Sequence, residues 1–357
     1  MGAANGGAKA MIKRLPLLLV ADTSTPEALG SKFLRGAVDA GIDPAKEIRV
    51  SYTSPAPGYS PSMRKHRGKI FYRLADRRSW EWWEFQYQLA RQIQELQPHL
   101  VLVTGILPLS TEIFKSIRRN GGRIVNYLTD DPWNPIHRRR CFIANLKLYD
   151  HIFSTKQALR NRLETAGALS TSWLPFAYDP YLHHPPKSPE PEPADVVFVG
   201  TGAKERLPWL QAIGDIPGIT RRLHGNDWHR LATPGWQRSN AVSGEAYRQA
   251  IHGARVALGL LRQANGDLST DRSYEIGAIG GCGLYQDSSE HRNLLQDYPD
   301  AGFFSSPLEL KKRVQELLED PKLQQLLRER GAKALRQQQH TYAERLHTIM
   351  SSSTGSQ

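Results

Sequence analysis

The sequence contains very little cysteine. Among 357 residues only Cys141 and Cys282 occur, and they fall in what we expect to be different domains. Neither a CxxC pair nor a Cys/His spacing typical of zinc sites is present. A disulfide framework and a structural zinc site are therefore excluded, and we expect a reduced, cytoplasmic setting.

Long apolar runs are also missing. No stretch approaches the roughly eighteen apolar residues that span a membrane, so any membrane contact must be peripheral. The run LPLLLVA, which follows Lys13 and Arg14, is as short as a signal-peptide core can be and has no small-x-small cleavage site after it. We interpret it as a first β-strand. Residues 1–9 and 351–357 are poor in apolar side chains, and we expect them to be disordered.

Motifs for covalent catalysis and for dinucleotide binding are absent as well. The sequence has no Ser/His/Asp set and no nucleophile elbow. Gly200 and Gly202 are followed by Glu205, where a GxGxxG motif needs its third glycine. No short-period repeat occurs, which excludes a solenoid.

What the sequence does contain is an alternation of short apolar runs and helical patterns. In the first half, the runs LPLLLVA, EIRVSY, HLVLVTG, RIVNYLTD and HIFST alternate with predicted helices over residues 26–40, 79–96 and 110–120. The segment HHPPKSPEPEPAD (183–195) is too rich in proline for a helix or a central strand and reads as a linker. At 357 residues, 39% of them hydrophobic, the chain can form two cores.

The second half repeats this pattern. We predict strands near Val196, Thr220, Val256, Leu284 and Phe303. The domains are then an N-terminal one at residues 10–182, the linker at 183–195, a C-terminal one at 196–350 and a tail at 351–357. Each domain would be a Rossmann-like, doubly wound parallel sheet, and a cleft would lie at the carboxyl ends of the two sheets.

The segment ANGDLSTDRSYEIGAIGGCGLYQD (264–287) is the most informative stretch. It follows an apolar run at 256–261 that is short enough for a buried strand. Ser269 and Thr270 are good N-cap residues, so a helix starting near Asp271 would direct its first amides toward an anion. A phosphate group is the expected ligand.

This segment also resembles known glycosyltransferases. Asp267 and Glu275 are eight residues apart, similar to the Glu-(x)7-Glu signature of retaining GT-B glycosyltransferases, although Asp267 is one methylene shorter than Glu. The pattern STDRSYEIGAIGG resembles the C-terminal domain of CgeB-type (spore-maturation) glycosyltransferases. The resemblance includes VVFVGTGAKERLPWL (196–210), LHGNDW (223–228) and the stretch 302–346, which ends in the cluster His340, Thr341, Tyr342 and Arg345.

The resemblance implies a fold, a donor and roles for individual residues. It implies a GT-B α/β fold whose second domain binds a nucleotide sugar as co-substrate, with no further cofactor. Glu275 would bind the ribose hydroxyls and Asp267 the donor sugar, while Arg206, Arg272 and Lys204 would hold the diphosphate. The remaining donor-site candidates in these motifs are Gly200, Gly225, Ser269 and Ser273. Family members are thought to react on one face of the sugar, so the anomeric configuration would be retained.

An acidic turn in the first domain is the candidate acceptor site. Asp130 and Asp131 follow the predicted strand RIVNYL, at the carboxyl end that faces the cleft. CgeB-like proteins have a similar acidic turn at this point. One of these carboxylates would orient or deprotonate an acceptor hydroxyl; the alternative is an ordinary Asp turn before Pro132. A Mg²⁺ or Mn²⁺ site belongs to the other major transferase fold, which lacks a second nucleotide domain, so we expect no metal.

The net charge of +12 is the feature that this interpretation explains least. The basic runs at 63–78 and 137–140 suit an anionic membrane surface, a polyanionic acceptor or simply a solvated face. The aromatic run SWEWWEFQY (79–87) beside them would also suit nucleic acid. Its glutamates form a polar helical stripe, however, so we expect the aromatic side chains to pack, and no nucleic-acid motif is present.

We therefore predict a cytoplasmic glycosyltransferase that moves a sugar from a nucleotide donor to an acceptor bound by the first domain. The acceptor class, whether glycan, lipid, protein or small molecule, stays open, as does peripheral contact with the inner face of a membrane. Two alternatives remain. One is a nucleotide-sugar epimerase of the same architecture, and the other is a non-catalytic basic protein that binds nucleic acid or a surface.

Overall fold

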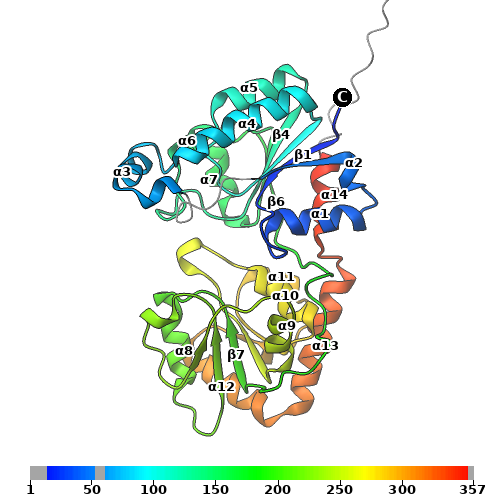
Figure 1. The fold of residues 1–357 in the computed structure, drawn as a ribbon. Coiled ribbons are helices and arrows are strands. Elements are labelled where there is room, and N and C mark those ends of the chain that lie inside the picture. Colours follow the sequence, from blue (N-terminus) through cyan, green and yellow to red (C-terminus); the bar gives the residue numbers. More distant parts are fainter. Residues whose placement is uncertain (1–13, 53–60, 353–357) are drawn as a thin grey trace, which may run out of the picture.

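The computed structural model describes residues 14–52 and 61–352 and consists of two lobes, each a parallel sheet with helices on both faces (Figure 1). The first sheet has the spatial order β2 (Ile48–Tyr52), β1 (Leu17–Ala21), β3 (Leu100–Thr104), β4 (Arg123–Leu128), β5 (His151–Ser154) and β6 (Thr171–Trp173). The second has the order β12 (Phe303–Phe304), β11 (Gly283–Gln286), β10 (Val256–Gly259), β7 (Val196–Val199), β8 (Arg221–His224) and β9 (Gln237–Ser239). The predicted pair of doubly wound parallel sheets is confirmed.

Helices cover both faces of these sheets. The first half of the chain contributes α1 (Leu29–Asp39), α2 (Pro44–Glu47), α3 (His66–Leu74), α4 (Trp80–Leu96), α5 (Thr111–Arg119), α6 (Arg140–Ala144) and α7 (Arg160–Thr165). The second half contributes α8 (Leu207–Gly214), α9 (Gly244–Gly253), α10 (Asp271–Ile279), α11 (Ser289–Leu294), α12 (Pro307–Glu319), α13 (Pro321–Gln337) and α14 (Tyr342–Ser352). Within the described residues, no helix combines the length and the apolar character that crossing a bilayer requires.

The central strands β1 and β3 of the first sheet are buried on both faces because they are apolar along almost their whole length. In β1, Leu17 and Leu19 pack on one face, while Leu18 and Val20 pack on the other. Side chains alternate between the faces of a strand, so a continuous apolar run suits a strand covered on both sides. The second domain has one large core, built around the buried strands β7, β10 and β11.

The last helix corrects the predicted domain boundary. α14 lies beside α1 in the first lobe (Figure 1), where Tyr342, Leu346 and Ile349 join the core that contains Leu17 and Phe33. The rings of Phe33 and Tyr342 meet edge to face, 5.3 Å apart. The predicted C-terminal domain of residues 196–350 therefore ends too late, since 342–352 belong with the first sheet. Helical periodicity shows that α14 has an apolar face, but not which sheet that face covers.

Both sheets have a topological switch point that faces the other lobe. In the first sheet the order of the strands reverses between β1 and β3, and in the second between β7 and β10. Loops leave such a switch point in opposite directions, which opens a crevice at the carboxyl ends of the strands. The segment 183–195, which leads into β7, contains no helix or strand.

Candidate functional site

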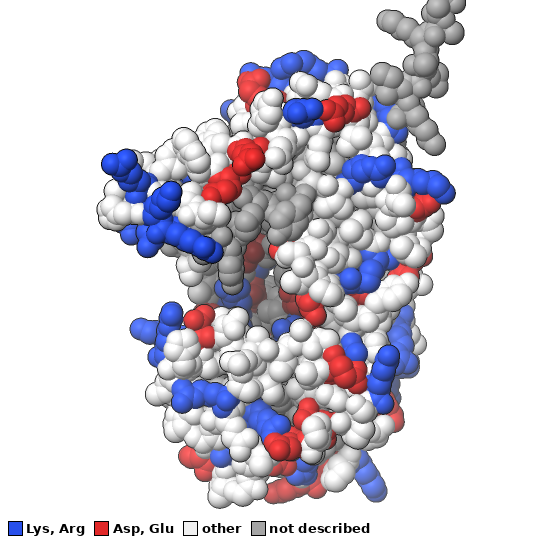
Figure 2. All heavy atoms as spheres, viewed as in Figure 1, with Lys and Arg blue, Asp and Glu red and all other residues white. Residues whose placement is uncertain are grey.

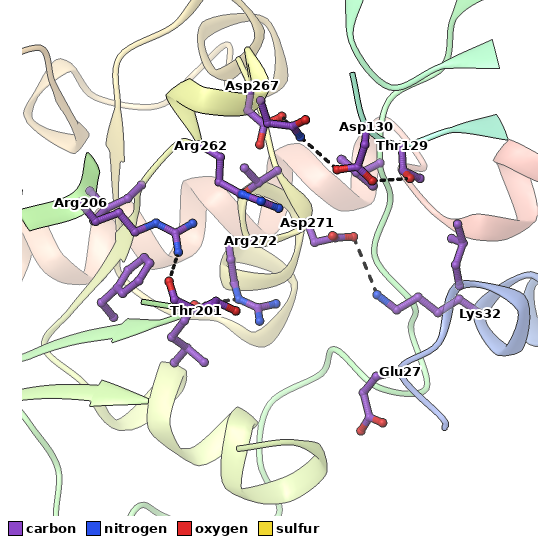
Figure 3. A pocket seen from close by; sticks show the side chains of 18 of the residues that line it. Glu27, Lys32, Thr129, Asp130, Thr201, Arg206, Arg262, Asp267, Asp271 and Arg272 are labelled. Carbon is purple, nitrogen blue, oxygen red and sulfur yellow. Dashed lines mark hydrogen bonds and ion pairs between the residues drawn. The ribbon is translucent and has the colours of Figure 1, made fainter. Parts of the chain in front are cut away.

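A cavity of about 440 Å³ lies between the two lobes. A hollow is visible there in the space-filling view (Figure 2), and Figure 3 shows the polar side chains that line it. The second domain contributes residues that follow β7 and β10 and the start of α10, which are the segments at its switch point. The first domain contributes residues that follow β1 and β4.

Three arginines line the wall formed by the second domain: Arg206, Arg262 and Arg272. Arg206 is 7% exposed, stacks over the ring of Phe198 at 5.0 Å and donates to the carbonyl of Thr201. Burial, with Arg262 nearby, lowers the pKa of Arg206 to about 10, so the guanidinium stays charged at neutral pH. Within the described residues its Nε is buried without a hydrogen-bond partner. This wall therefore offers positive charge to an anionic ligand.

The N-terminus of α10 lies on the same wall. Thr270 is the N-cap, as predicted, and it forms a capping box with Ser273, whose Oγ accepts a hydrogen bond of 2.9 Å from the amide of Thr270. Thr270 and Asp271 line the cavity, so the positive end of the helix dipole faces it.

Two predicted donor-binding serines support this helix from behind and do not line the cavity. Ser273 is buried, and its Oγ lies 2.7 Å from Nε2 of His291. His291 Nδ1 lies 2.6 Å from the carbonyl of Gln286, which only accepts, so Nδ1 carries the proton and Nε2 accepts from Ser273. Ser269 donates to Glu290 over 2.6 Å. Their predicted contact with the donor is not supported by this position, because both hydroxyls are buried and bonded within the protein, Ser273 to the amide of Thr270 and to His291, and Ser269 to Glu290.

The two aspartates of the acidic turn in the first domain have different roles. Asp130 lines the cavity, accepts from Thr129 Oγ1 over 3.0 Å and from Asn265 Nδ2 over 3.2 Å, and lies 3.6 Å from His137 Nε2. Asp131 does not line the cavity. It accepts from the amide of Trp133 over 2.8 Å, which is the turn-forming role that the sequence left as an alternative.

Asp267 also lines the cavity, close to the first domain. It is 8% exposed and forms an ion pair with Lys156, and Asn265 Nδ2 donates to it over 3.0 Å. Burial raises the pKa of Asp267, although Lys156 opposes the shift. Lys156 follows β5, so this ion pair joins the two lobes at the edge of the cavity.

Glu275, by contrast, lies beneath the cavity and does not line it. It is 2% exposed and is enclosed by Lys32 at 3.4 Å, His183 at 3.3 Å, Tyr247 at 2.9 Å and Arg272. Although burial opposes the charge, Arg272, His183 and Lys32 hold the pKa of Glu275 below its ordinary value. One turn into α10, the side chain faces α9 and α1 rather than the opening. Its predicted contact with a ribose is not supported by this position.

The remaining predicted residues differ in their access to the cavity. Gly200 lines it at the end of β7. Lys204 is exposed and does not line it, because it is on the outer side of the turn that buries Arg206. Gly225 does not line it either and has a structural role: at φ +152°, a Cβ there would lie 2.1 Å from the carbonyl oxygen of Gly200.

Several lining residues escaped the sequence analysis. Lys32 and Glu27 come from α1 and the loop before it, where the sequence predicts only a helix. Asn265 lies within the segment 264–287, two residues ahead of Asp267, and Arg262 lies two residues before that segment begins. Within the described residues, no group of three or more His, Cys, Asp or Glu side chains is placed to hold a metal ion.

Comparisons with known proteins agree with this architecture. A family model described as glycosyl transferase-like matches residues 206–351. No curated protein sequence matches the chain. Among solved structures, the chain is similar to an O-GlcNAc transferase variant from Thermobaculum terrenum, at 15% identity and a TM-score of 0.57, covering 95% of this chain and 68% of that one.

Two further structures match over almost their whole length. T4 phage BGT in complex with its UDP-glucose substrate has 12% identity and a TM-score of 0.53, and 92% of this chain and 96% of that one are covered. A protein assigned as a UDP-N-acetylglucosamine 2-epimerase from Listeria monocytogenes has 11% identity and a TM-score of 0.53, with 91% and 95% covered. At such low sequence identity, structural similarity establishes only the fold, which is GT-B.

Proposed function

We propose that the protein is a glycosyltransferase that takes a sugar from a nucleotide donor held by the second domain and passes it to an acceptor at the wall of the first. One observation carries the proposal: three arginines and the N-terminus of α10 share one wall of a cavity, and Asp130 lies on the other. The family match over residues 206–351 and the GT-B neighbours support the same reaction class.

The donor diphosphate binds at the arginine wall. As the glycosidic bond breaks, negative charge accumulates on the leaving diphosphate, and preorganised cations and amides stabilise that charge. Arg206 is buried and held by Thr201, so little reorganisation is needed. The arginines supply the positive charge that a metal supplies in other transferases, which favours a metal-independent reaction. The nucleotide sugar is then the only co-substrate required.

The acceptor hydroxyl binds on the opposite side. Asp130 accepts a hydrogen bond from that hydroxyl and orients its oxygen toward the sugar, while Asp267 contacts the donor sugar. In a reaction with retention, an oxygen of the departing phosphate takes the proton of the acceptor. Glycans, lipids and proteins all carry such hydroxyls, so the proposal holds for each of these acceptor classes. The site operates in the cytoplasm under this proposal.

Glu275 acts through Arg272 rather than on the ribose. Its carboxylate pairs with the Arg272 guanidinium from below, and Arg272 Nε donates to the carbonyl of Val199 over 3.1 Å. These two contacts fix the guanidinium at the cavity wall. Glu275 is therefore a positioning residue.

The proposal is tested by incubating the protein with a panel of UDP, GDP and TDP sugars, with and without candidate acceptors. Release of nucleoside diphosphate that depends on an acceptor, with formation of a glycosylated product, is expected. The Listeria structure makes epimerisation the specific alternative, and that reaction would convert the donor without any acceptor. No binding of any nucleotide, measured as no rise in melting temperature, would favour a non-catalytic surface-binding protein instead.

A further inference from the structure

Helix α3 projects from the first lobe, and none of its residues is buried (Figure 1). One side holds it in place: a Cβ at Gly68 would lie only 1.8 Å from the carbonyl oxygen of Ser62, and the ring of Phe71 meets that of Trp80 edge to face at 4.8 Å. The opposite side faces solvent. A helix of nine residues without a single buried one is unusual, because packing provides most of the stability of a helix.

The outer side of α3 has an apolar centre flanked by cations. Ile70 and Leu74 lie one turn apart and are 46% and 83% exposed. At 100° per residue, Lys69 and Arg73 fall on one flank of this pair and Arg67 on the other. This is the pattern of a helix that lies at the interface between a lipid bilayer and water.

Helix α4 adds a second exposed stripe, of aromatic side chains, next to the side of α3 where Trp80 meets Phe71. Trp80, Trp83 and Tyr87 are 67%, 42% and 67% exposed, and their spacing of three and four residues places them along one stripe. We expected the aromatic run to pack, and this holds only for part of it: Trp82 and Phe85 are buried in the core. Tryptophan and tyrosine are the side chains enriched where a protein meets lipid headgroups.

The charge of this surface is strongly one-sided. Residues 64–78 contain seven Lys and Arg side chains and a single carboxylate, Asp76, which accepts from the amides of Arg140 and Cys141. Residues 79–87 add two carboxylates, Glu81, which accepts from Ser62, and the exposed Glu84. Within residues 14–52 and 61–352, no ion pair is formed by Lys65, at the N-cap of α3, or by the three α3 cations Arg67, Lys69 and Arg73. Figure 2 shows these basic side chains gathered over α3.

We propose that this α3–α4 platform, residues 64–87, docks on an anionic lipid bilayer. The exposed aliphatic pair Ile70 and Leu74 decides between partners: a polyanion uses cations and aromatic rings, but it gains nothing from exposed leucine and isoleucine. An anionic bilayer binds both kinds of side chain, since the cations contact the headgroups and the apolar side chains enter the boundary with the acyl chains. This inference goes beyond the proposed transfer reaction and does not depend on it.

The test is flotation of the full chain with vesicles of phosphatidylcholine alone and of phosphatidylcholine mixed with phosphatidylglycerol. Binding to the mixed vesicles only, weakened by salt, is expected. The double variant Lys69→Glu/Arg73→Glu should bind at least about tenfold more weakly, since each cation contributes about a factor of five. The double variant Ile70→Glu/Leu74→Glu should lose at least about as much, since it removes the apolar side chains and brings two carboxylates to the anionic surface. Leu308→Glu, at a site on α12 that is 78% exposed, and Lys312→Glu are the matched controls and should bind like the parent chain.

Other results would overturn the proposal. These are equal binding to both vesicle types, an unchanged affinity of the Ile70→Glu/Leu74→Glu variant, or a control variant that loses binding to the same extent. The surface would instead be one for polyanions if the chain binds single-stranded DNA or heparin tightly and the Ile70→Glu/Leu74→Glu variant keeps both this binding and its vesicle binding. Melting temperature shows that each variant is folded, and nucleotide binding by the same variants tests the transfer proposal separately.

Discussion

The two walls of the interdomain cavity differ in the charged groups that they offer to a ligand. The wall of the second domain presents Arg206 and Arg262 beside the N-terminus of α10, and its carboxylates Asp267 and Asp271 are paired with lysines of the first domain. The wall of the first domain presents Asp130 and Glu27. Within the described residues, neither Arg206 nor Arg262 forms an ion pair. Their charge is therefore available to a ligand. The difference indicates that one wall is built for a diphosphate and the other for a neutral, hydroxyl-bearing group.

The cations that the first domain does contribute serve another purpose. Lys32 reaches Glu275 and Lys156 reaches Asp267, and each pair joins the two lobes. Although burial lowers the pKa of Lys32, Glu275 and Asp271 outweigh it and raise that pKa overall. Lys32 and Lys156 thus hold the lobes together, whereas Arg206 and Arg262 face the ligand.

The largest effect is expected from Lys32→Met. This change leaves the buried carboxylate of Glu275 without one of its cations, and breaking a buried ion pair typically costs about 3 kcal/mol. We expect the free energy of unfolding, measured by urea denaturation, to fall by about that amount. Lys46→Met removes an exposed ion pair with Asp43 and should change little. If the two variants are equally stable, Lys32 does not link the lobes.

Next in size is the effect of Asp130→Asn on transfer. The amide is nearly isosteric but a poorer acceptor for a hydroxyl, so we expect kcat to fall about 100-fold while nucleotide affinity stays the same. Asp131→Asn is the matched control, because Asp131 forms a turn outside the cavity, and its kcat should be nearly unchanged. A larger loss in the Asp131 variant would show that the two roles were assigned the wrong way round.

His291, which bonds to Ser273 in the first turn of α10, predicts that stability depends on pH. Burial lowers the pKa of His291 to about 4, below its ordinary value of 6.5. Between these values the unfolded chain binds a proton that the folded chain does not, so stability falls as the pH falls. His291 alone should cost about 2 kcal/mol between pH 6.5 and pH 5. His291→Gln should flatten the dependence measured by urea denaturation, and His347→Gln, on the exposed side of α14, should not. An unchanged slope in His291→Gln would contradict the assignment.

The smallest effect concerns two exposed cations near the cleft. Arg262 lines the cavity and Lys204 does not, although the sequence pattern singled out Lys204. Arg262→Ala should weaken nucleotide binding about tenfold, the size of one charge-assisted hydrogen bond, and Lys204→Ala should leave it unchanged. The dependence of melting temperature on nucleotide concentration reports both. The reverse order of effects would mean that the diphosphate lies further toward the outer turn.

Most of the fold was predictable because apolar strands and capped helices leave local signals. Val196–Val199 and Leu100–Thr104 are continuous apolar runs, and Thr270 capped α10 as predicted. The edge strand Gln237–Ser239 was missed because it is exposed and polar, so it lacks such a signal. The packing of α14 on α1 could not be predicted, because it depends on contacts between distant parts of the chain and no local pattern encodes them.

The site was predictable only in part. Arg206, Arg272, Asp130, Asp267 and Gly200 do line the cavity. Glu275 does not, because spacing along a helix places it one turn from Asp271 without telling which neighbour encloses it. Lys32 is more than 200 residues from its partner Glu275 in the chain, and no local pattern connects two such residues.

The central claim is that the arginine wall binds the diphosphate and the Asp130 wall does not. Calorimetric titration of UDP, GDP and TDP into the parent chain, Arg206→Met and Asp130→Asn tests it most directly. We predict micromolar binding of at least one nucleotide, about 100-fold weaker binding by Arg206→Met, and no change in Asp130→Asn. Failure of all three nucleotides to bind the parent chain, or equal losses in the two variants, would contradict the account.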